Sequence, residues 1–245
     1  MACFKQTAVF LVCLLTLGGC VAPQPKTSAD LNTQEDILLK SKNYTGLINL
    51  YRGWLKDKDE PGIRLKLSRY YYQAGDYKSS LYYLQPLSTK ADLNVYTLQA
   101  QNMIALGDYS QAIRVTDRML QHDSQNAEAW NLRGIALALS GKLQEGGQAI
   151  QKSRDLFIAD DVAINNLAMV ALLDRRYQDA VSLLLPQYLR GRRQPRLLHN
   201  LVLALVKVGD TRYARDIIQS ESLSDYPNEL IDALERTGPL QKGVA

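Results

Sequence analysis

A turn centred on glycine recurs along most of the chain at a nearly constant interval. Gly75-Asp76-Tyr77 is followed, at spacings of 32, 34, 34 and 34 residues, by matching tripeptides that start at Gly107, Gly141, Arg175 and Gly209. A fixed period of this length marks a repeat architecture, in which each unit buries its apolar face only against its neighbours. The chain is therefore predicted to be an array of five similar units.

The residues in register predict that each unit is a helical hairpin. When the turn glycine is placed at position fifteen, the repeats start at Pro61, Leu93, Ala127, Asp161 and Pro195. Position eight holds Ser68, Ala100, Gly134, Ala168 and Val202, and position twenty holds Ser80, Ala112, Gly146, Ala180 and Ala214. Small side chains at both positions let two helices cross closely, and glycine at position fifteen suits the left-handed residue that ends the first helix. Arg175 is expected to take that conformation at a cost of roughly 1–2 kcal/mol.

These columns resemble the tetratricopeptide repeat, most closely over Ala127 to Gly141. The resemblance implies an all-α tetratricopeptide-repeat superhelix of about five to six helix-turn-helix units. The five clear repeats are expected at 61–92, 93–126, 127–160, 161–194 and 195–228. Residues 33–60 are predicted to form a degenerate first repeat, and 229–245 a capping helix and tail, because such stacks need a polar end.

The first twenty residues predict export and lipid attachment. Ala8 to Leu17 is an apolar run that is too short for a membrane span of about 20 residues and fits a signal peptide. It ends in Leu17-Gly18-Gly19-Cys20, which resembles a bacterial lipobox in which the Cys20 thiol accepts a diacylglyceryl group. An ordinary secretory signal followed by an incidental cysteine is the alternative.

The lipobox divides the N-terminal region into two predicted segments. Residues 1–19 would be the signal peptide, and residues 20–32, which contain two prolines, would be the lipidated cysteine and a flexible tether. No aspartate follows Cys20 at the second mature position. By resemblance to lipoproteins of enteric-type bacteria, this favours an outer-membrane anchor with the protein facing the periplasm.

Catalytic and metal-binding patterns are absent from the sequence. Removal of the signal peptide would leave Cys20 as the single cysteine, which can form neither an internal disulfide nor a multi-cysteine metal site. His122 and His199 fall in different repeats, without acidic ligands at metal spacing. A net charge of +4 is too small to indicate nucleic-acid binding. We therefore expect no enzyme, no metal and no cofactor.

The predicted binding surface lies on the first helices of the last three repeats. In this repeat class the first helix of each pair lines a concave groove, so positions five, nine, twelve and thirteen are expected to face a partner. They form an apolar trough with polar edges, which suits an amphipathic helix or a strand of a partner protein. The predicted groove consists of Asn131, Ile135, Ala138, Leu139, Asn165, Met169, Leu172, Leu173, His199, Leu203, Val206 and Lys207. Alternatively, the chain's own tail or a second copy fills the trough.

Two charged groups near the last repeats have simpler interpretations. Arg190, Arg192, Arg193 and Arg196 are interpreted as a solvated loop, with a contact to an anionic lipid or partner as the alternative. Asp160-Asp161 is interpreted as a pair that caps the following helix.

Three stretches, 131–150, 163–184 and 197–218, resemble the TadD proteins of the tight-adherence (Flp) pilus machinery. The resemblance implies a pilotin-like lipoprotein that binds protein partners, the outer-membrane secretin or other pilus-assembly components, and supports secretin localisation or assembly. A type IV pilus pilotin and a periplasmic adaptor for cell-wall hydrolases remain the alternatives.

Overall fold

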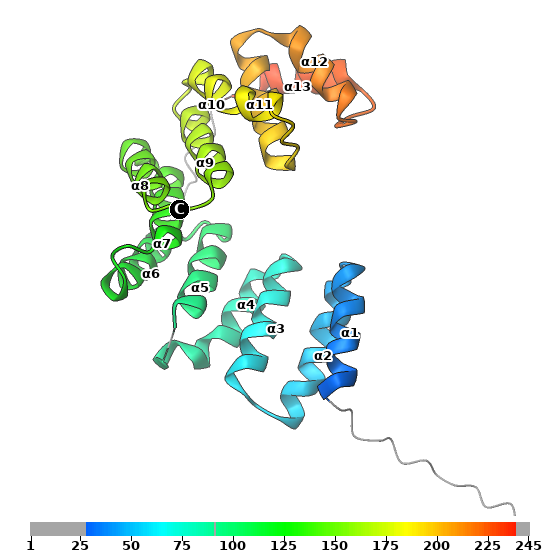
Figure 1. Cartoon of the computed structure of the whole chain (residues 1–245), viewed down its shortest axis with the longest axis vertical. Coiled ribbons are helices and arrows are strands. Elements are labelled where there is room, and N and C mark those ends of the chain that lie inside the picture. Colours follow the sequence, from blue (N-terminus) through cyan, green and yellow to red (C-terminus); the bar gives the residue numbers. More distant parts are fainter. Residues whose placement is uncertain (1–27, 91, 239–245) are drawn as a thin grey trace, which may run out of the picture. The chain divides into compact units, whose positions relative to one another are not determined.

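The structure is a computed structural model in which residues 28–90 and 92–238 are described (Figure 1). The chain divides into two compact units, residues 1–42 and residues 43–245. The expected signal peptide, Cys20 and the first part of the tether lie outside the described residues, as do residues 239–245.

The first unit contributes one described helix, α1 (Ser28–Lys40). The tether predicted over residues 20–32 is therefore wrong for its last residues, which are helical. Pro23 and Pro25 precede the helix, and no proline or glycine interrupts the segment from Ser28 to Lys40. The boundary between the units falls inside residues 33–60, so the two halves of the expected degenerate repeat belong to different units.

Within the described part, the second unit begins with helix α2 (Tyr44–Asp57), continues through five helical hairpins and ends with one further helix. The hairpins pair α3 (Pro61–Gln73) with α4 (Tyr77–Leu84), α5 (Leu93–Ala105) with α6 (Tyr109–His122), α7 (Ala127–Leu139) with α8 (Leu143–Asp155), α9 (Asp160–Leu173) with α10 (Tyr177–Leu189), and α11 (Pro195–Val208) with α12 (Thr211–Ser220). A 3-10 helix, η1 (Gln85–Lys90), follows α4, and α13 (Pro227–Arg236) follows the last hairpin.

The recurring turn has the backbone geometry that the sequence predicts. The turn glycines of four hairpins have φ angles between 80° and 91°, and Arg175, in the fourth hairpin, has φ 58°. The left-handed conformation predicted for Arg175 is confirmed. A residue with a Cβ atom there retains a strain that the glycines avoid.

The residue after the turn explains why aspartate accompanies glycine in three repeats. Asp76, Asp108 and Asp210 each accept a hydrogen bond from a backbone N–H three residues later, at 3.0, 3.2 and 3.1 Å. These bonds cap the second helix of each hairpin. Glycine therefore ends one helix, and aspartate starts the next.

The interpretation of Asp160-Asp161 as a capping pair is wrong. Helix α9 already begins at Asp160, and the preceding Ala159 offers no side-chain cap. Asp160 instead accepts from Arg154 Nε at 2.7 Å, while Asp161 Oδ1 accepts from the backbone N–H of Val162 at 3.0 Å. Both carboxylates lie in the first helical turn, where they still interact favourably with the helix dipole.

Helices α7 and α8 cross at very short range. A Cβ atom added at Gly134 would lie 2.8 Å from the carbonyl oxygen of Gly146, and one added at Gly146 would lie 2.8 Å from the backbone nitrogen of Ala138. These contacts are with backbone atoms, which cannot move aside as a side chain can. The small residues at positions eight and twenty therefore set the helix separation in this hairpin.

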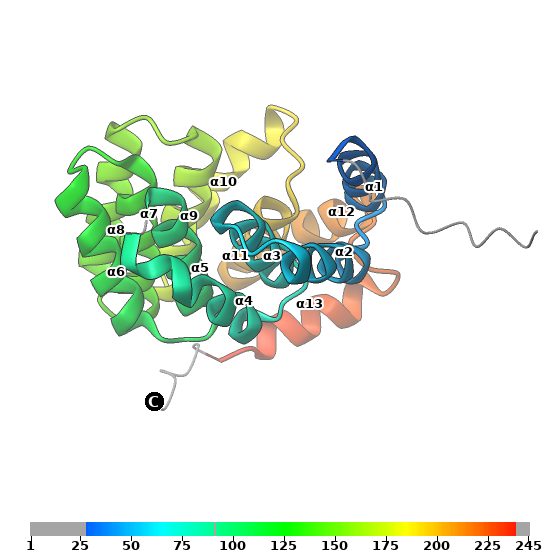
Figure 2. The ribbon, with the colours of Figure 1, turned by 90° about the horizontal axis from the view of Figure 1, so that it is seen from below.

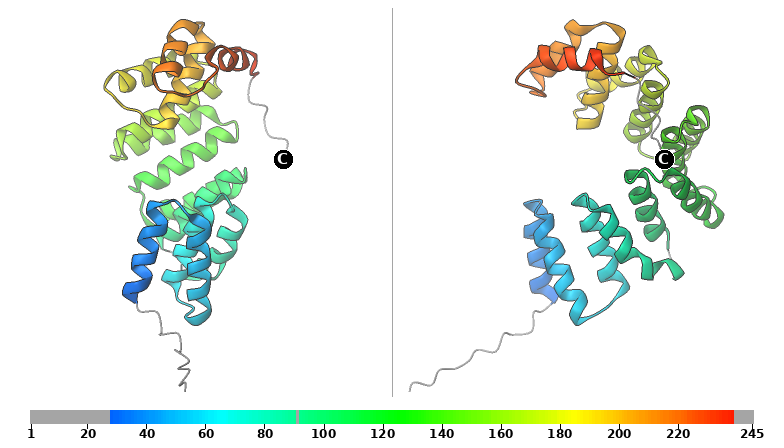
Figure 3. Two further views of the ribbon diagram at one scale, coloured as in Figure 1. Left: turned by 90° about the vertical axis from the view of Figure 1, so that its right-hand side faces the viewer. Right: turned by 180° about the vertical axis from the view of Figure 1, so that it is seen from behind.

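The first helices of the hairpins form the inner row of the second unit. Each of α3, α5, α7, α9 and α11 packs against the first helix that follows it, with α13 as the last member of the row. Among the described residues, the second helices of neighbouring hairpins show no comparable packing. Helices α6, α8, α10 and α12 lie on the outer side of the curve in Figure 1 and in the right-hand view of Figure 3, and Figure 2 shows the same stack from below. The first helices, which pack more closely on one another than the second helices do, therefore line the concave side of the curved stack.

Candidate partner-binding groove

The inner faces of α7, α9 and α11 carry a series of half-buried apolar side chains. Met169 and Leu173 pack partly on the buried residues Ala138, Ile150 and Val170, which anchors them while one side stays exposed. We call this series the apolar strip, and it consists of Ile135, Leu139, Met169, Leu172, Leu173 and Leu203. All six were predicted groove residues, and all retain partial exposure.

Three predicted groove residues are inaccessible to a partner. Asn131, Ala138 and Val206 are only 4%, 2% and 4% exposed. Ala138 turns toward α8, where it lies against Gly146, and Val206 belongs to the core cluster that also contains Ile231 of α13. Sequence position on the helix identifies the inner side, but it does not reveal which neighbouring helix covers a residue there.

The predicted amides Asn131 and Asn165 are part of an asparagine ladder that joins successive inner helices. Asn166 Nδ2 donates to Asn131 Oδ1 at 2.7 Å, and Asn200 Nδ2 donates to Asn165 Oδ1 at 3.1 Å. The donors occupy position six of the following repeat, next to the predicted groove residue at position five. The Asn165-Asn166 and His199-Asn200 neighbours in the sequence were the available signal.

Helix α13 covers the far end of the groove. Lys207 Nζ donates to the carbonyl oxygens of Glu235 and Thr237, at 3.1 and 2.6 Å. Lys207 thus caps the last turn of α13 and is not a cation that closes an open groove. His199, another predicted groove residue, is exposed.

A pocket of about 120 Å³ opens beside the strip, where α9 and α11 begin. Its floor is apolar and its rim combines a carboxylate, amides and Arg196. Gln194 Nε2 donates to Asp161 Oδ2 at 3.2 Å, whereas Arg196 has no hydrogen-bonding partner among the described residues. The lining residues are Asp161, Val162, Asn165, Asn166, Gln194, Arg196 and Leu197.

Comparison with known proteins identifies the architecture. No protein-family model and no curated protein matches the chain. Among solved structures, a tetratricopeptide-repeat protein from Parabacteroides merdae ATCC 43184 is similar with a TM-score of 0.74 at 14% identity, covering 87% of this chain and 85% of that one. The thermophilic protein TTC0263 from Thermus thermophilus, also of this repeat class, gives 0.62 at 18% identity, covering 72% and 97%. MamA (41-end) from Desulfovibrio magneticus RS-1 gives 0.54 at 15% identity, covering 69% and 100%.

This chain has the tetratricopeptide-repeat fold. The predicted all-α fold class, with its repeated hairpins and capping helix, is confirmed. Sequence identities this low establish the architecture of the tetratricopeptide array and nothing about its partner.

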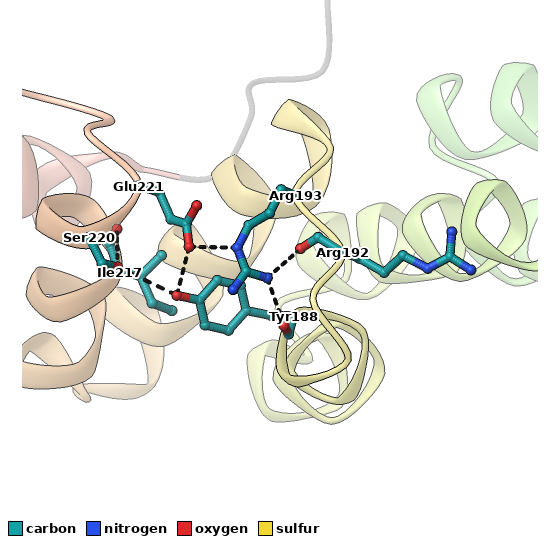
Figure 4. Close-up of polar contacts among 6 residues, drawn as sticks. All are labelled: Tyr188, Arg192, Arg193, Ile217, Ser220 and Glu221. Carbon is teal, nitrogen blue, oxygen red and sulfur yellow. Dashed lines mark hydrogen bonds and ion pairs between the residues drawn. The ribbon is translucent and has the colours of Figure 1, made fainter.

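One member of the arginine cluster of the tetratricopeptide array, Arg193, is engaged in structural contacts (Figure 4). Arg193 Nε lies 2.6 Å from Glu221 Oε1, and its guanidinium lies over the ring of Tyr188 at 4.1 Å. Arg193 also donates to the carbonyl oxygens of Tyr188 and Arg192, both at 2.8 Å, and the Tyr188 hydroxyl donates to Glu221 at 3.0 Å. This network joins the end of α10 to the end of α12.

The remaining arginines of the cluster do not form a uniform basic patch. Arg192 lies 4.0 Å from the carboxylate of Asp161. Arg190 and Arg196 are exposed and have no hydrogen-bonding partner among the described residues. Since half of the cluster faces carboxylates, the simpler interpretation, an exposed loop, fits better than an anionic-lipid contact.

Glu128, in the first turn of α7, gives a pH-dependent prediction. Burial raises the pKa of its carboxyl above the ordinary value of 4.5. The folded state then binds a proton more tightly than the unfolded chain, so stability falls as the pH rises from about 4.5 through the raised pKa, and the loss persists at neutral pH. Glu128→Gln should therefore raise the melting temperature near pH 7 more than near pH 4. An equal shift at both pH values in thermal melts would contradict this assignment.

Neither a metal centre nor a membrane span is found in residues 28–90 and 92–238. In these residues, histidine, cysteine, aspartate and glutamate nowhere gather in groups of three that suit a metal ion. The described helices are also too short or too polar to traverse a bilayer.

Proposed function

We propose that this chain is a non-enzymatic scaffold that holds a segment of a partner protein against its inner helices. The observation that carries the proposal is the apolar strip on α7, α9 and α11, whose six side chains remain partly exposed. Contiguous exposed apolar surface commonly marks an interaction site. The core beneath the strip is buried, so the site is preformed.

The geometry of the strip favours an amphipathic helix as the bound segment. Ile135 and Leu139 are one helical turn apart on α7, and Met169, Leu172 and Leu173 repeat this spacing on α9. Apolar side chains of a partner helix at matching intervals would lie between these rows. The carboxylate, amide and arginine groups at the pocket beside Asn165 would then bind a polar residue at one end of that helix.

We further propose an outer-membrane lipoprotein of the tight-adherence (Flp) pilus system that supports secretin localisation or assembly. Support comes from the lipobox-like Leu17 to Cys20 and from the resemblance of three stretches to TadD proteins. Acyl chains on Cys20 would hold the scaffold at the inner leaflet, because each buried methylene contributes about 0.8 kcal/mol. The apolar strip would then face the periplasm and bind a secretin segment.

Capture of crosslinked partners from membranes tests the groove. Leu139→Glu/Leu173→Glu places two charges on the strip and should reduce capture of the partner at least tenfold, since apolar contacts would be replaced by buried carboxylates. Phe157→Glu/Leu189→Glu is the matched control, because these residues are 93% and 69% exposed outside the strip. Equal capture by both variants, with both folded by circular dichroism, would locate the binding site elsewhere.

Secretin assembly tests the finer proposal. Deletion of the protein should leave the secretin unassembled or misplaced, and the control variant should restore multimers where the strip variant does not. Normal secretin multimers after deletion would contradict the pilus assignment. Capture of a type IV pilus secretin, or of a cell-wall hydrolase, would favour the corresponding alternative function.

A further inference from the structure

A basic pocket lies at the turn between α2 and α3, outside the groove formed by α7, α9 and α11. Its volume is about 250 Å³. Three cations, one carboxylate and one tyrosine surround it, and they are Arg52, Lys56, Arg64, Asp59 and Tyr83, with Leu55 as the apolar member. We propose that this pocket is a binding site for a phosphate group.

The guanidinium of Arg64 is held in place by one carboxylate. Its Nε and one terminal nitrogen both donate to Asp59, each at 2.5 Å, and this bidentate pair lowers the pKa of the Asp59 carboxyl. The pairing fixes the plane of the guanidinium and leaves its other terminal nitrogen free of Asp59. A group oriented in this way loses little conformational freedom when it binds a ligand.

The other two cations are not neutralised. Arg52 and Lys56 are exposed, lie one turn apart on α2 and have no hydrogen-bonding partner among the described residues. Three positive charges therefore face a single carboxylate, which already binds one of them. This excess favours an anion that carries more than one oxygen acceptor.

Tyr83, the tyrosine of the pocket, packs against two other tyrosine rings. Tyr83 stacks on Tyr71 with ring centroids 5.3 Å apart, and Tyr82 meets Tyr83 edge-on at 5.2 Å. Burial, together with the neighbouring Tyr83, raises the pKa of Tyr71, and Arg52 is close enough to act on Tyr71 in the opposite direction. The pKa of Arg64 is raised first by its hydrogen bond to Asp59 and further by the nearby Tyr82 and Tyr83. Both guanidiniums thus lie near tyrosine hydroxyls, which can donate further hydrogen bonds to a bound oxyanion.

Phosphate is the ligand class that matches this set of donors. Guanidinium groups present paired N–H donors that fit two phosphate oxygens, while lysine adds a positive charge without a geometric requirement. The phosphate can come from the solution or from the headgroup of an anionic phospholipid. The two sources present the same oxygen atoms to the pocket, so the test must separate them.

Titration of the full chain with small probes tests the site without reference to any partner protein. The probes are inorganic phosphate, dihexanoyl-phosphatidylglycerol below its micellar concentration, and the zwitterionic dihexanoyl-phosphatidylcholine. Saturable shifts of the side-chain Nε–H resonances of Arg52 and Arg64 should report binding, with affinity from calorimetry. Arg52→Gln/Lys56→Gln should weaken binding roughly a hundredfold, about tenfold for each cation removed.

The control variant removes the same charge elsewhere. Arg114 and Arg118 are exposed on α6 with the same four-residue spacing, so Arg114→Gln/Arg118→Gln changes the net charge equally. Binding retained by the control and lost by the pocket variant would support the site. Tighter binding of phosphatidylglycerol than of inorganic phosphate would identify the lipid as the source, and the reverse order would identify free phosphate. Equal loss in both variants, or the absence of saturation with either anion, would overturn the proposal.

Discussion

Gly146→Ala is expected to destabilise the array by about 1–3 kcal/mol, although alanine normally stabilises a helix. The added Cβ would lie 2.8 Å from the backbone nitrogen of Ala138 and 2.8 Å from the carbonyl oxygen of Gly134. Neither atom belongs to a side chain that can rotate away, so α7 and α8 must separate. Because the crossing lies beside Ile150, which is fully buried, the separation would also open the core.

The adjacent residue supplies the control for this prediction. A Cβ atom at Gly147 would meet only Val170 Cγ1, at the ordinary distance of 3.7 Å. Gly147→Ala should therefore stabilise the protein by about 0.5–1 kcal/mol, through the smaller entropy of the unfolded chain. Urea denaturation followed by circular dichroism should move the two midpoints in opposite directions. Midpoints that both rise would show that the hairpin adapts to a methyl group at this crossing.

Ile231→Asp should cost at least about 3 kcal/mol or detach α13 from the stack. Ile231 is 3% exposed and lies in the core cluster with Val206 and Ile217. A carboxylate there would be buried among the apolar side chains of that cluster, so the helix would have to leave. Its departure would expose Val206 and release Lys207 from the carbonyl oxygens at the end of α13.

Hydrogen exchange separates local detachment from global unfolding. In Ile231→Asp, the amides of α11 and α12 should lose protection first, because the stack is stabilised mainly by contacts between neighbouring repeats. Ala233→Asp adds the same charge to an exposed residue of the same helix and should leave protection unchanged. Full protection of α12 in Ile231→Asp would mean that α13 does not stabilise the last repeat.

The fold could be predicted because its determinants are local and repeated. Each repeat has a turn that needs a left-handed residue and a helix crossing that needs small residues, always at the same positions. A single copy of this pattern would be weak evidence for a helical hairpin, but five copies in register support one another. Helices α3, α5, α7 and α11 begin at the residues where the repeats were expected to start. The start of α1 and the first turn of α9 were missed, because they depend on single residues outside the repeated pattern.

The candidate site was less predictable, because accessibility depends on neighbours that are distant in the sequence. The period places Val206 and Lys207 on the inner side, but only the docking of α13 shows that they are covered. The partner of Arg193 is Glu221, which no local spacing links to it. The asparagine ladder likewise joins residues that are 35 positions apart.

That ladder has a mechanical consequence. Any change of curvature between α7, α9 and α11 must stretch the bonds from Asn166 to Asn131 and from Asn200 to Asn165, so this half of the array resists bending. In the first two repeats, positions five and six hold leucine, lysine and threonine, and one exposed bond from Arg69 to Asn94 joins α3 to α5. The part of the array that contains α7, α9 and α11 would thus be stiff, and the part that contains α3 and α5 would be more compliant. Elastic adjustment to a ligand would take place in the compliant part, nearer the N-terminus.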